Sequence, residues 1–373
     1  MRRFISGNDA VAEAVRLARP DVISAYPITP QTTVVEKLAE FVESGMLDSE
    51  FIHVESEHSA LSAAMGASLA GVRTFTATSS QGLLYMAEVL PYAAGGRFPI
   101  VMMNANRSIA LPWSIYGDQR DSLSQLDSGW IQAYAENAEE AFDMTLMAFK
   151  IAEKIKVPFM VNLDGFRLTH TYEALDIPDE AQVKRFLPRF EQNENCIDLD
   201  NPRSFGFGAG PDTNAAFHKS HHEAMTGGFT EIAEIEREYA DIFGRSYTGG
   251  IDCYKCDDAE YILITLGSVS GLCRLVADGL RDNGIKAGIL QIRYMRPFPD
   301  KGVFEATKNA KAVAVLEKDI SFGGAGTVFT NVKAAAKADL NIIGGLGGAD
   351  ISAEQISGIF TVLINGDTGV KWL

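Results

Sequence analysis

Short apolar runs alternate with longer segments of helical periodicity along the first half of the chain. Runs of about four to eight apolar residues predict buried strands, and apolar residues three or four apart predict helices. Strands are expected at 21–25, 51–54, 73–78, 99–104 and 157–163, and helices at 34–42, 59–70, 83–94 and 139–155. This alternation is typical of a parallel, doubly wound α/β sheet with helices on both faces.

The periodicity fades in the middle of the chain and returns in the last third. Prolines and acidic residues interrupt the middle, where helices are still expected at 181–186 and 224–243. Further strands are expected at 261–267, 287–292 and 312–316, and helices at 271–280 and 328–337. We therefore predict a first domain over 1–175, an extended connector over 176–255 that wraps a partner or the other domain, and a smaller α/β domain over 256–373.

The turn after the first predicted strand reads YPITPQT and starts at Tyr26. A hydroxyl at Thr29 followed by Pro30 predicts a helix start, and Thr33 with Glu36 offers a second start as a capping box. A strand, a tight turn and a helix N-terminus together point backbone N–H groups at a small anion. Taken alone, the pattern is explained more simply by a turn that only packs.

A polar or charged side chain follows each predicted strand of the first half. These side chains are Thr29, Glu57, Gln81, Arg107 and Asp164. Ligands of parallel sheets bind at the carboxyl ends of the strands, so we expect these groups to share a site. Ser56 is a plausible helix cap, which would place Glu57 in the first turn. The helix dipole favours a carboxylate there, and this is the purely structural explanation of Glu57.

Composition restricts the class of partner. The chain has 373 residues, 46% of them hydrophobic and 22% charged, enough for a large core and two domains. The net charge of −16 argues against nucleic acid or an anionic membrane surface as partner. No apolar run approaches the roughly 20 residues that span a bilayer, and the N-terminus lacks an apolar signal region. We expect a cytoplasmic protein.

Two of the four cysteines, Cys253 and Cys256, form a single CxxC motif. A zinc site needs a second pair or histidines at ligand spacing, and the nearest histidines are only loosely grouped. Surface cysteines are therefore the simpler interpretation, and a disulfide between them is left open. The chain has no four-cysteine run for an iron–sulfur cluster.

Together, these motifs resemble the 2-oxoacid:ferredoxin oxidoreductases. The series comprises YPITPQT, VESEHSA at 54–60, TATSSQGL at 76–83, NANR at 104–107, GDQRDS at 117–122, DSGWIQ at 127–132, LDGF at 163–166, ITLGS at 264–268, IRYMRPFP at 292–299 and GGLGG at 344–348. The resemblance covers nearly the whole chain and is to the separate α subunit of the multi-subunit enzymes, of the pyruvate synthase type. It implies a pyrimidine-type thiamine diphosphate-binding domain followed by a transketolase C-terminal-like α/β domain.

The resemblance also implies roles for particular residues. In this family a buried glutamate hydrogen-bonds to the aminopyrimidine ring of thiamine diphosphate, and Glu57 aligns with it as a catalytic and cofactor-binding residue. Arg107 and Thr29 would bind the carboxylate of the 2-oxoacid. Ser80 and Gln81 are expected near the cofactor and Asp118 near the substrate, without an assigned chemical step. No metal ligand is expected in this chain.

Half of the cofactor site is missing from the sequence. Thiamine enzymes hold the diphosphate through Mg²⁺ with a GDG motif and later asparagines, but here Gln119 follows Gly117-Asp118 and no such asparagines follow. The resemblance implies a β subunit with the diphosphate and Mg²⁺ half-site and an iron–sulfur cluster, a γ subunit, and a ferredoxin-like subunit. The implied reaction is oxidative decarboxylation of a 2-oxoacid with coenzyme A, giving acyl-CoA, carbon dioxide and reduced ferredoxin.

The substrate is less well determined than the reaction. Pyruvate is the commonest substrate of this subunit form. The bulky segment 111–116 could instead line a pocket for an aromatic or branched 2-oxoacid such as phenylglyoxylate, with NAD or ferredoxin as final acceptor, or it could pack in the core. Oxalate is disfavoured because the segment lacks charged residues. A non-redox thiamine enzyme and a scaffold subunit without a working site are further alternatives. The direction of flux and the subunit number stay open.

Overall fold

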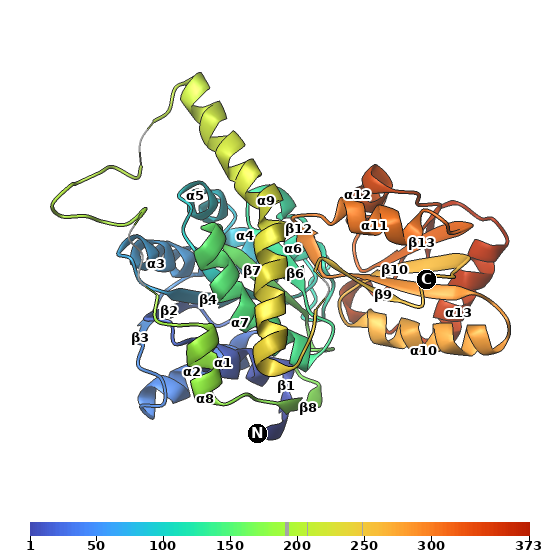
Figure 1. Cartoon of the computed structure of the whole chain (residues 1–373), viewed down its shortest axis with the longest axis horizontal. Coiled ribbons are helices and arrows are strands. Elements are labelled where there is room, and N and C mark those ends of the chain that lie inside the picture. Colours follow the sequence, from blue (N-terminus) through green and yellow to red (C-terminus); the bar gives the residue numbers. More distant parts are fainter. Residues whose placement is uncertain (191–193, 207, 248) are drawn as a thin grey trace.

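Two large sheets, one in each half of the chain, form the framework of the computed structural model (Figure 1). The structure describes residues 1–190, 194–206, 208–247 and 249–373. The first sheet has seven strands in the order β12-β6-β7-β5-β4-β2-β3, and the second has six in the order β15-β14-β13-β10-β11-β9. A third, two-stranded sheet pairs β1 (Arg2–Ser6) with β8 (Tyr172–Asp176).

The strands of the first sheet run parallel, except for the edge strand β12, which is antiparallel to β6. They are β2 (Val22–Ala25), β3 (Glu50–His53), β4 (Thr74–Thr78), β5 (Val101–Asn106), β6 (Ile131–Tyr134), β7 (Phe159–Asp164) and β12 (Tyr294–Arg296). Their carboxyl ends therefore meet at one edge of the sheet, as the sequence pattern predicts.

Helices cover both faces of the first sheet, which confirms the doubly wound arrangement. One face packs against α1 (Gly7–Ala18), α2 (Thr32–Glu43) and α7 (Ala138–Ile155). The other packs against α3 (Glu57–Leu69), α4 (Ser80–Tyr85) and α5 (Val89–Gly95). Shorter elements are α6 (Arg120–Leu123), the 3₁₀ turn η1 (Leu126–Ser128) and α8 (Glu180–Phe186).

The second sheet is also parallel, except for its edge strand β9. Its strands are β9 (Ile251–Tyr254), β10 (Tyr261–Leu266), β11 (Ala287–Ile292), β13 (Ala312–Glu317), β14 (Leu340–Ile343) and β15 (Gly369–Trp372). One face carries α10 (Val269–Asp282) and α13 (Ala353–Ile364), and the other α11 (Asp300–Thr307) and α12 (Thr327–Ala335). The 3₁₀ turn η2 (Leu346–Gly348) follows β14.

The middle of the chain is more ordered than its broken periodicity predicts. It contains α8, β9 and the 33-residue helix α9 (Pro211–Phe243), which packs on α7. The first turns of α9 are exposed and project beyond the first sheet (Figure 1). Parts of the predicted connector, at 191–193, 207 and 248, lie outside the described residues. The strand β12, from the last third, joins the first sheet, so our proposed division at 175 and 255 does not separate the two sheets cleanly.

Two details of the predicted helices are wrong. The segment 83–94 is not one helix, because α4 and α5 are separated at 86–88. Helix α2 starts at Thr32 rather than at Thr29 or Thr33, and its cap residue, Gln31, makes no side-chain capping bond. Instead, the Gln31 amide donates to the Ala77 carbonyl at 2.9 Å and the Thr33 hydroxyl accepts from Asn8 at 2.7 Å. The side chains of Gln31 and Thr33 therefore bond to residues distant in the sequence and do not cap the helix.

Candidate active site

Glu57 is the first residue of α3, directly after β3, and its carboxylate is buried beside α4. Ser56 caps the helix as the sequence predicts, accepting a hydrogen bond from the Ser59 N–H at 3.2 Å. The residue is 8% exposed, and no group in the described parts of the chain donates a hydrogen bond to its carboxylate. A side chain at Gly82 would place its Cβ 2.7 Å from Glu57 Oε1, so glycine is needed at that position. The Glu57 side chain is therefore largely enclosed, and within the described residues its carboxylate, which is not among the fully buried unpaired groups, has no hydrogen-bond donor.

Arg107 follows β5 and contacts the turn after β2. Its guanidinium donates to the Thr29 carbonyl at 2.9 Å and to the Ser114 carbonyl at 3.0 Å, and lies 5.2 Å from the ring centre of Trp113. Arg107 and Thr29, both predicted to bind the substrate, thus lie in contact, but through the Thr29 backbone carbonyl and not through its hydroxyl. Within the described residues Nη2 of Arg107 has no acceptor, which leaves N–H donors for an anion.

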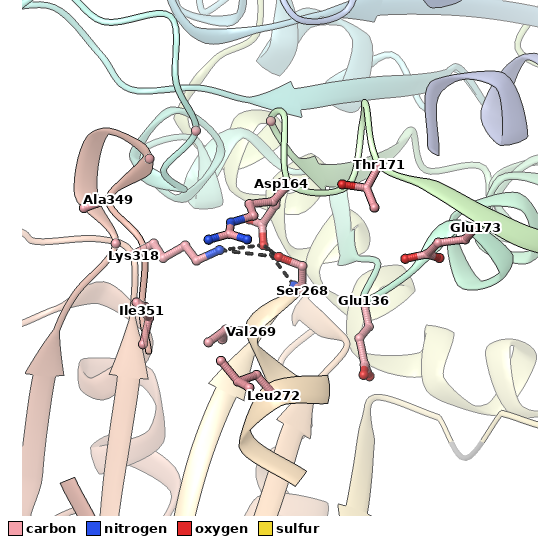
Figure 2. Close-up of a pocket in the computed structure, with 15 residues that line it drawn as sticks. Glu136, Asp164, Thr171, Glu173, Ser268, Val269, Leu272, Lys318, Ala349 and Ile351 are labelled. Carbon is pink, nitrogen blue, oxygen red and sulfur yellow. Dashed lines mark hydrogen bonds and ion pairs between the residues drawn. The ribbon is translucent and has the colours of Figure 1, made fainter. Parts of the chain in front are cut away.

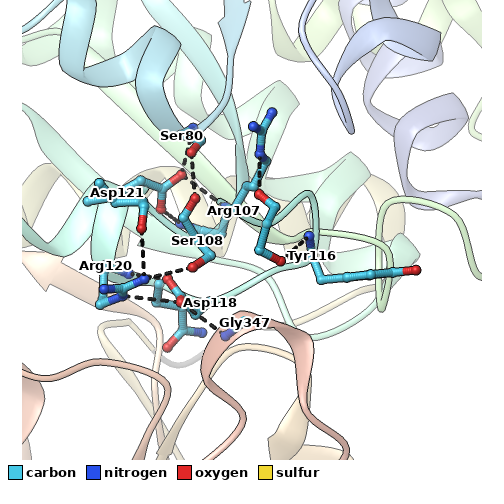
Figure 3. Close-up of polar contacts among 12 residues, drawn as sticks. Ser80, Arg107, Ser108, Tyr116, Asp118, Arg120, Asp121 and Gly347 are labelled. Atoms are coloured by element: carbon cyan, nitrogen blue, oxygen red, sulfur yellow. Dashed lines mark hydrogen bonds and ion pairs between the residues drawn. The ribbon is translucent and has the colours of Figure 1, made fainter. Parts of the chain in front are cut away.

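Asp121 joins the ends of β4 and β5, and the sequence analysis missed it (Figure 3). The side chain is fully buried and accepts backbone N–H bonds from Ser80 at 3.0 Å and from Arg107 at 3.1 Å. Asn106 donates to its other oxygen at 2.7 Å. The signal was present in the GDQRDS motif, but we had assigned a role only to its first acidic residue.

Ser80 is buried and its hydroxyl bonds to neighbouring residues. Its hydroxyl lies 2.6 Å from Gln81 Oε1 and 2.7 Å from the Ser108 carbonyl, and the residue is fully buried. Its φ angle of 50° is in the left-handed region, where a non-glycine residue needs support. The bond from its N–H to Asp121 supplies that support. Gln81, which is only partly buried, is the member of this pair that can reach a ligand.

Comparisons with known proteins identify the family. Residues 13–237 match the family model of the thiamine diphosphate-binding domain of pyruvate flavodoxin/ferredoxin oxidoreductases, and residues 259–356 match core domain II of pyruvate:ferredoxin oxidoreductase. The pyruvate synthase subunit PorA of Methanothermobacter thermautotrophicus is 46% identical over 100% of this chain and 97% of its own length. This chain belongs to the 2-oxoacid:ferredoxin oxidoreductase family.

Other relatives in this family carry a different substrate in their names. The ketoisovalerate oxidoreductase subunit VorA of Pyrococcus abyssi is 42% identical and covers 96% of this chain and 92% of its own length. Like PorA and VorA, the present chain is an α subunit of a multisubunit oxidoreductase, and its first part is a thiamine diphosphate-binding domain.

Two solved structures share the fold. The 2-oxoglutarate:ferredoxin oxidoreductase of Magnetococcus marinus aligns with a TM-score of 0.77 at 20% identity, over 97% of this chain and 65% of that longer chain. A split-gene transketolase in an inactive β4 tetramer aligns with a TM-score of 0.58 at 10% identity, over 97% and 99% of the two chains. Both place this α subunit in the transketolase-like α/β architecture.

Asp118 and Asp164 connect the two halves of the α subunit and do not join the group around Arg107. Asp118 Oδ2 accepts from the Gly347 N–H at 3.1 Å and from Arg120 Nε at 3.2 Å (Figure 3). Asp164 Oδ2 accepts from the Ser268 N–H and from Lys318 Nζ, both at 2.9 Å. Burial alone would raise the pKa of Asp164, but the Lys318 charge and the Ser268 bonds outweigh it, and the pKa is lowered. Asp164 at the end of β7 and Asp118 in the loop before α6 both accept hydrogen bonds from the second half of the chain.

A cleft of about 240 Å³ lies at this seam between the halves (Figure 2). Lys318, Ser268 and Asp164 line it and are already bonded to one another. Glu136, also in the lining, pairs with Arg274 at 2.6 Å. The charges of the cleft are therefore satisfied internally, in contrast to Glu57.

The segment 111–116 is exposed beside Arg107, so the alternative that it packs in the core is wrong. Leu111 is 86% exposed and Trp113 is 67% exposed. Tyr116 is also exposed, with its ring centre 5.2 Å from that of Phe166. An apolar surface next to an arginine with free donors is suited to a substrate or a partner chain.

We expect Asp121 to make the stability of the α subunit depend on pH. Burial raises the pKa of Asp121 from 3.8 to about 6. The N–H groups that donate to its carboxylate lower the pKa, but burial has the larger effect. Between about pH 4 and pH 6 the folded chain keeps a proton that the unfolded chain has lost, so this group's contribution to the free energy of unfolding falls as the pH rises. An Asp121→Asn variant lacks this titration. The difference in melting temperature between wild type and variant should shrink from about pH 4.5 to pH 7, and a constant difference would contradict the prediction.

Proposed function

We propose that this chain is the α subunit of a thiamine diphosphate-dependent enzyme that oxidatively decarboxylates a 2-oxoacid, with pyruvate as the favoured substrate. The products are acyl-CoA, carbon dioxide and reduced ferredoxin. The observation that carries the proposal is the buried Glu57 carboxylate, which lacks a donor in the described chain and lies at the sheet edge that also holds Arg107. The full-length similarity to pyruvate synthase PorA subunits supports the choice of substrate.

Glu57 fits the aminopyrimidine ring of thiamine diphosphate. The Glu57 residue is 8% exposed, and a carboxylate in so enclosed a place is stabilised by a donor, which a ring nitrogen of the cofactor can supply. When bound, thiamine diphosphate supplies the carbon that adds to the 2-oxo group and accepts electrons from it. Glu57 would hold the ring proton at its Oε atoms and so set the protonation of the aminopyrimidine. Gln81, held by Ser80, would contact the cofactor beside it.

Arg107 would bind the carboxylate of the 2-oxoacid. Two of its N–H groups are used by the Thr29 and Ser114 carbonyls, which fix the plane of the guanidinium. Its free donors can form charge-assisted bonds with the carboxylate until it leaves as carbon dioxide. In this proposal Thr29 acts through Arg107. Because its oxygens are bonded within the chain, Asp118 would align the halves and not contact the substrate directly.

The remaining parts of the enzyme are assigned to partner subunits. A β subunit would carry the diphosphate and Mg²⁺ half-site and an iron–sulfur cluster, since the motif of this chain departs from GDG at Gln119. A γ subunit and a ferredoxin-like subunit would complete the complex, with coenzyme A as acyl acceptor. The apolar segment 111–116 is available for the substrate or for the β subunit.

An assay of the native complex tests the proposal. With coenzyme A and ferredoxin, kcat/KM for pyruvate should exceed that for 2-oxoisovalerate and phenylglyoxylate by about tenfold or more, since each methylene in a pocket changes discrimination by roughly 10- to 200-fold. The VorA relatives make a branched 2-oxoacid the second candidate. A preference for the branched acid would favour that candidate. Turnover in a complex without iron would favour a non-redox thiamine enzyme.

A further inference from the structure

We propose that Cys253 and Cys256 form a redox-active dithiol, which exchanges with disulfides at a site separate from the thiamine centre. The two residues lie at the end of β9, the edge strand of the second sheet, so they are far in the fold from the strand ends that hold Glu57 and Arg107. Both cysteines are free thiols in this structure.

The two thiols differ in access. Cys253 is exposed, whereas Cys256 is 8% exposed and donates from its Sγ to the Ile289 carbonyl at 3.3 Å. An outer thiol that meets solvent and an inner thiol behind it is the arrangement needed for a nucleophile and a resolving cysteine.

The turn between the thiols is held in place by packing on β11. Lys255, inside the motif, has a φ of 55°, which brings the chain back toward the sheet. A Cβ at Gly288 would lie 3.0 Å from the Lys255 carbonyl oxygen, so the turn rests directly on the glycine backbone. The neighbouring thiol is the largest influence on each cysteine: Cys256 lowers the pKa of Cys253, and Cys253 raises the pKa of Cys256. The exposed thiol is therefore the one that ionises first.

Two ion pairs flank the motif. Asp252 pairs with Arg274 at 2.9 Å, and Lys255 pairs with Asp278 at 2.5 Å. In the described part of the chain, no set of three or more His, Cys, Asp or Glu residues could hold a metal ion. Two thiolates alone do not complete a tetrahedral zinc site, so disulfide exchange is the chemistry that remains.

The proposed reaction is a two-electron exchange with a low-molecular-weight or protein disulfide. The Cys253 thiolate attacks one sulfur of the disulfide and releases one thiolate, which takes up a proton. Cys256 then loses its proton, attacks the Cys253 sulfur of the mixed disulfide and releases the second thiolate. The Cys253–Cys256 pair is oxidised to a disulfide, and the external disulfide that was attacked is reduced to two thiols.

Peptide mapping of the assembled enzyme tests this proposal without measuring activity. The complex is incubated anaerobically with oxidised glutathione, alkylated, digested and analysed by mass spectrometry. In the wild type, the peptide that contains the motif should lose two hydrogen atoms and take up no alkyl group. Cys196, which is not part of a CxxC motif, serves as the internal control. It should either carry a glutathione adduct or be alkylated, because it has no second thiol beside it in a CxxC motif.

Two variants separate the roles of the thiols. Cys256→Ser should leave Cys253 as a stable mixed disulfide with glutathione, and Cys253→Ser should abolish all oxidation of the motif. The wild-type result decides the matter if either variant fails to assemble. A glutathione adduct on wild-type Cys253 like that of Cys256→Ser, or a motif that stays fully alkylated in the complex, would overturn the proposal.

Discussion

Replacing Glu57 with glutamine is expected to reduce turnover of the assembled enzyme by about a hundredfold or more, because a positioned acid or base contributes roughly 10²- to 10⁴-fold. The amide has nearly the same shape, so α3 and its Ser56 cap should form as before. It cannot hold the proton that, in the proposed function, the carboxylate shares with the aminopyrimidine. The measurement is kcat with saturating thiamine diphosphate, together with the apparent Kd of the cofactor.

Glu55→Gln is the matched control for this variant. Glu55 lies two residues earlier and is exposed, and among the described residues its carboxylate accepts a side-chain hydrogen bond from the hydroxyl of Ser59 alone. The same chemical change there should leave kcat unchanged. Full turnover of Glu57→Gln with added cofactor would contradict the role of Glu57 and with it the proposed function.

Replacing Arg107 with alanine is expected to lower kcat/KM by roughly 10- to 150-fold, the equivalent of about 1.5–3 kcal/mol for a hydrogen bond to a charged group. The loss should come mainly from KM if the arginine holds the carboxylate equally in the ground and transition states. Arg107→Lys keeps the charge but loses the planar fork, so it should recover only part of the loss. The measurement is a full saturation curve for the 2-oxoacid.

Arg185→Ala provides the control for Arg107→Ala. Arg185 is an exposed arginine in the last turn of α8, away from the strand ends. Its removal should leave the curve unchanged. An unchanged curve for Arg107→Ala as well would instead support a scaffold subunit that keeps the fold but has lost the site.

The order of the elements and the identity of the central carboxylate follow from the sequence. Hydrophobic periodicity predicts the strands β2 to β5 and β7 and the helices between them, since each is a local property of a short segment. The Ser56 cap and the position of Glu57 in the first turn are local as well. The motif series identifies the family, and Gln119 in place of a glycine is the basis for our proposal that the second half-site belongs to another chain.

Contacts between distant segments could not be predicted in this way. The short strand β12 has little apolar pattern of its own, and only its pairing with β6 makes it part of the first sheet. Helix α2 starts at Thr32 because Asn8 and Ala77, both far away in sequence, take the polar groups of Thr33 and Gln31. Local propensity is weak compared with such tertiary hydrogen bonds.

The sequence by itself determined which strands end in polar groups, and the tertiary structure decided which of these groups act together. Arg107 and Thr29 converge, whereas Asp118 and Asp164 turn to the second half and bind Gly347, Ser268 and Lys318. Spacing along a strand fixes the edge of the sheet that a side chain reaches, but not the group that it meets there. For Asp118 and Asp164 burial makes that choice, because a buried carboxylate is stabilised by donors and the second half provides them, whereas Glu57 has none among the described residues.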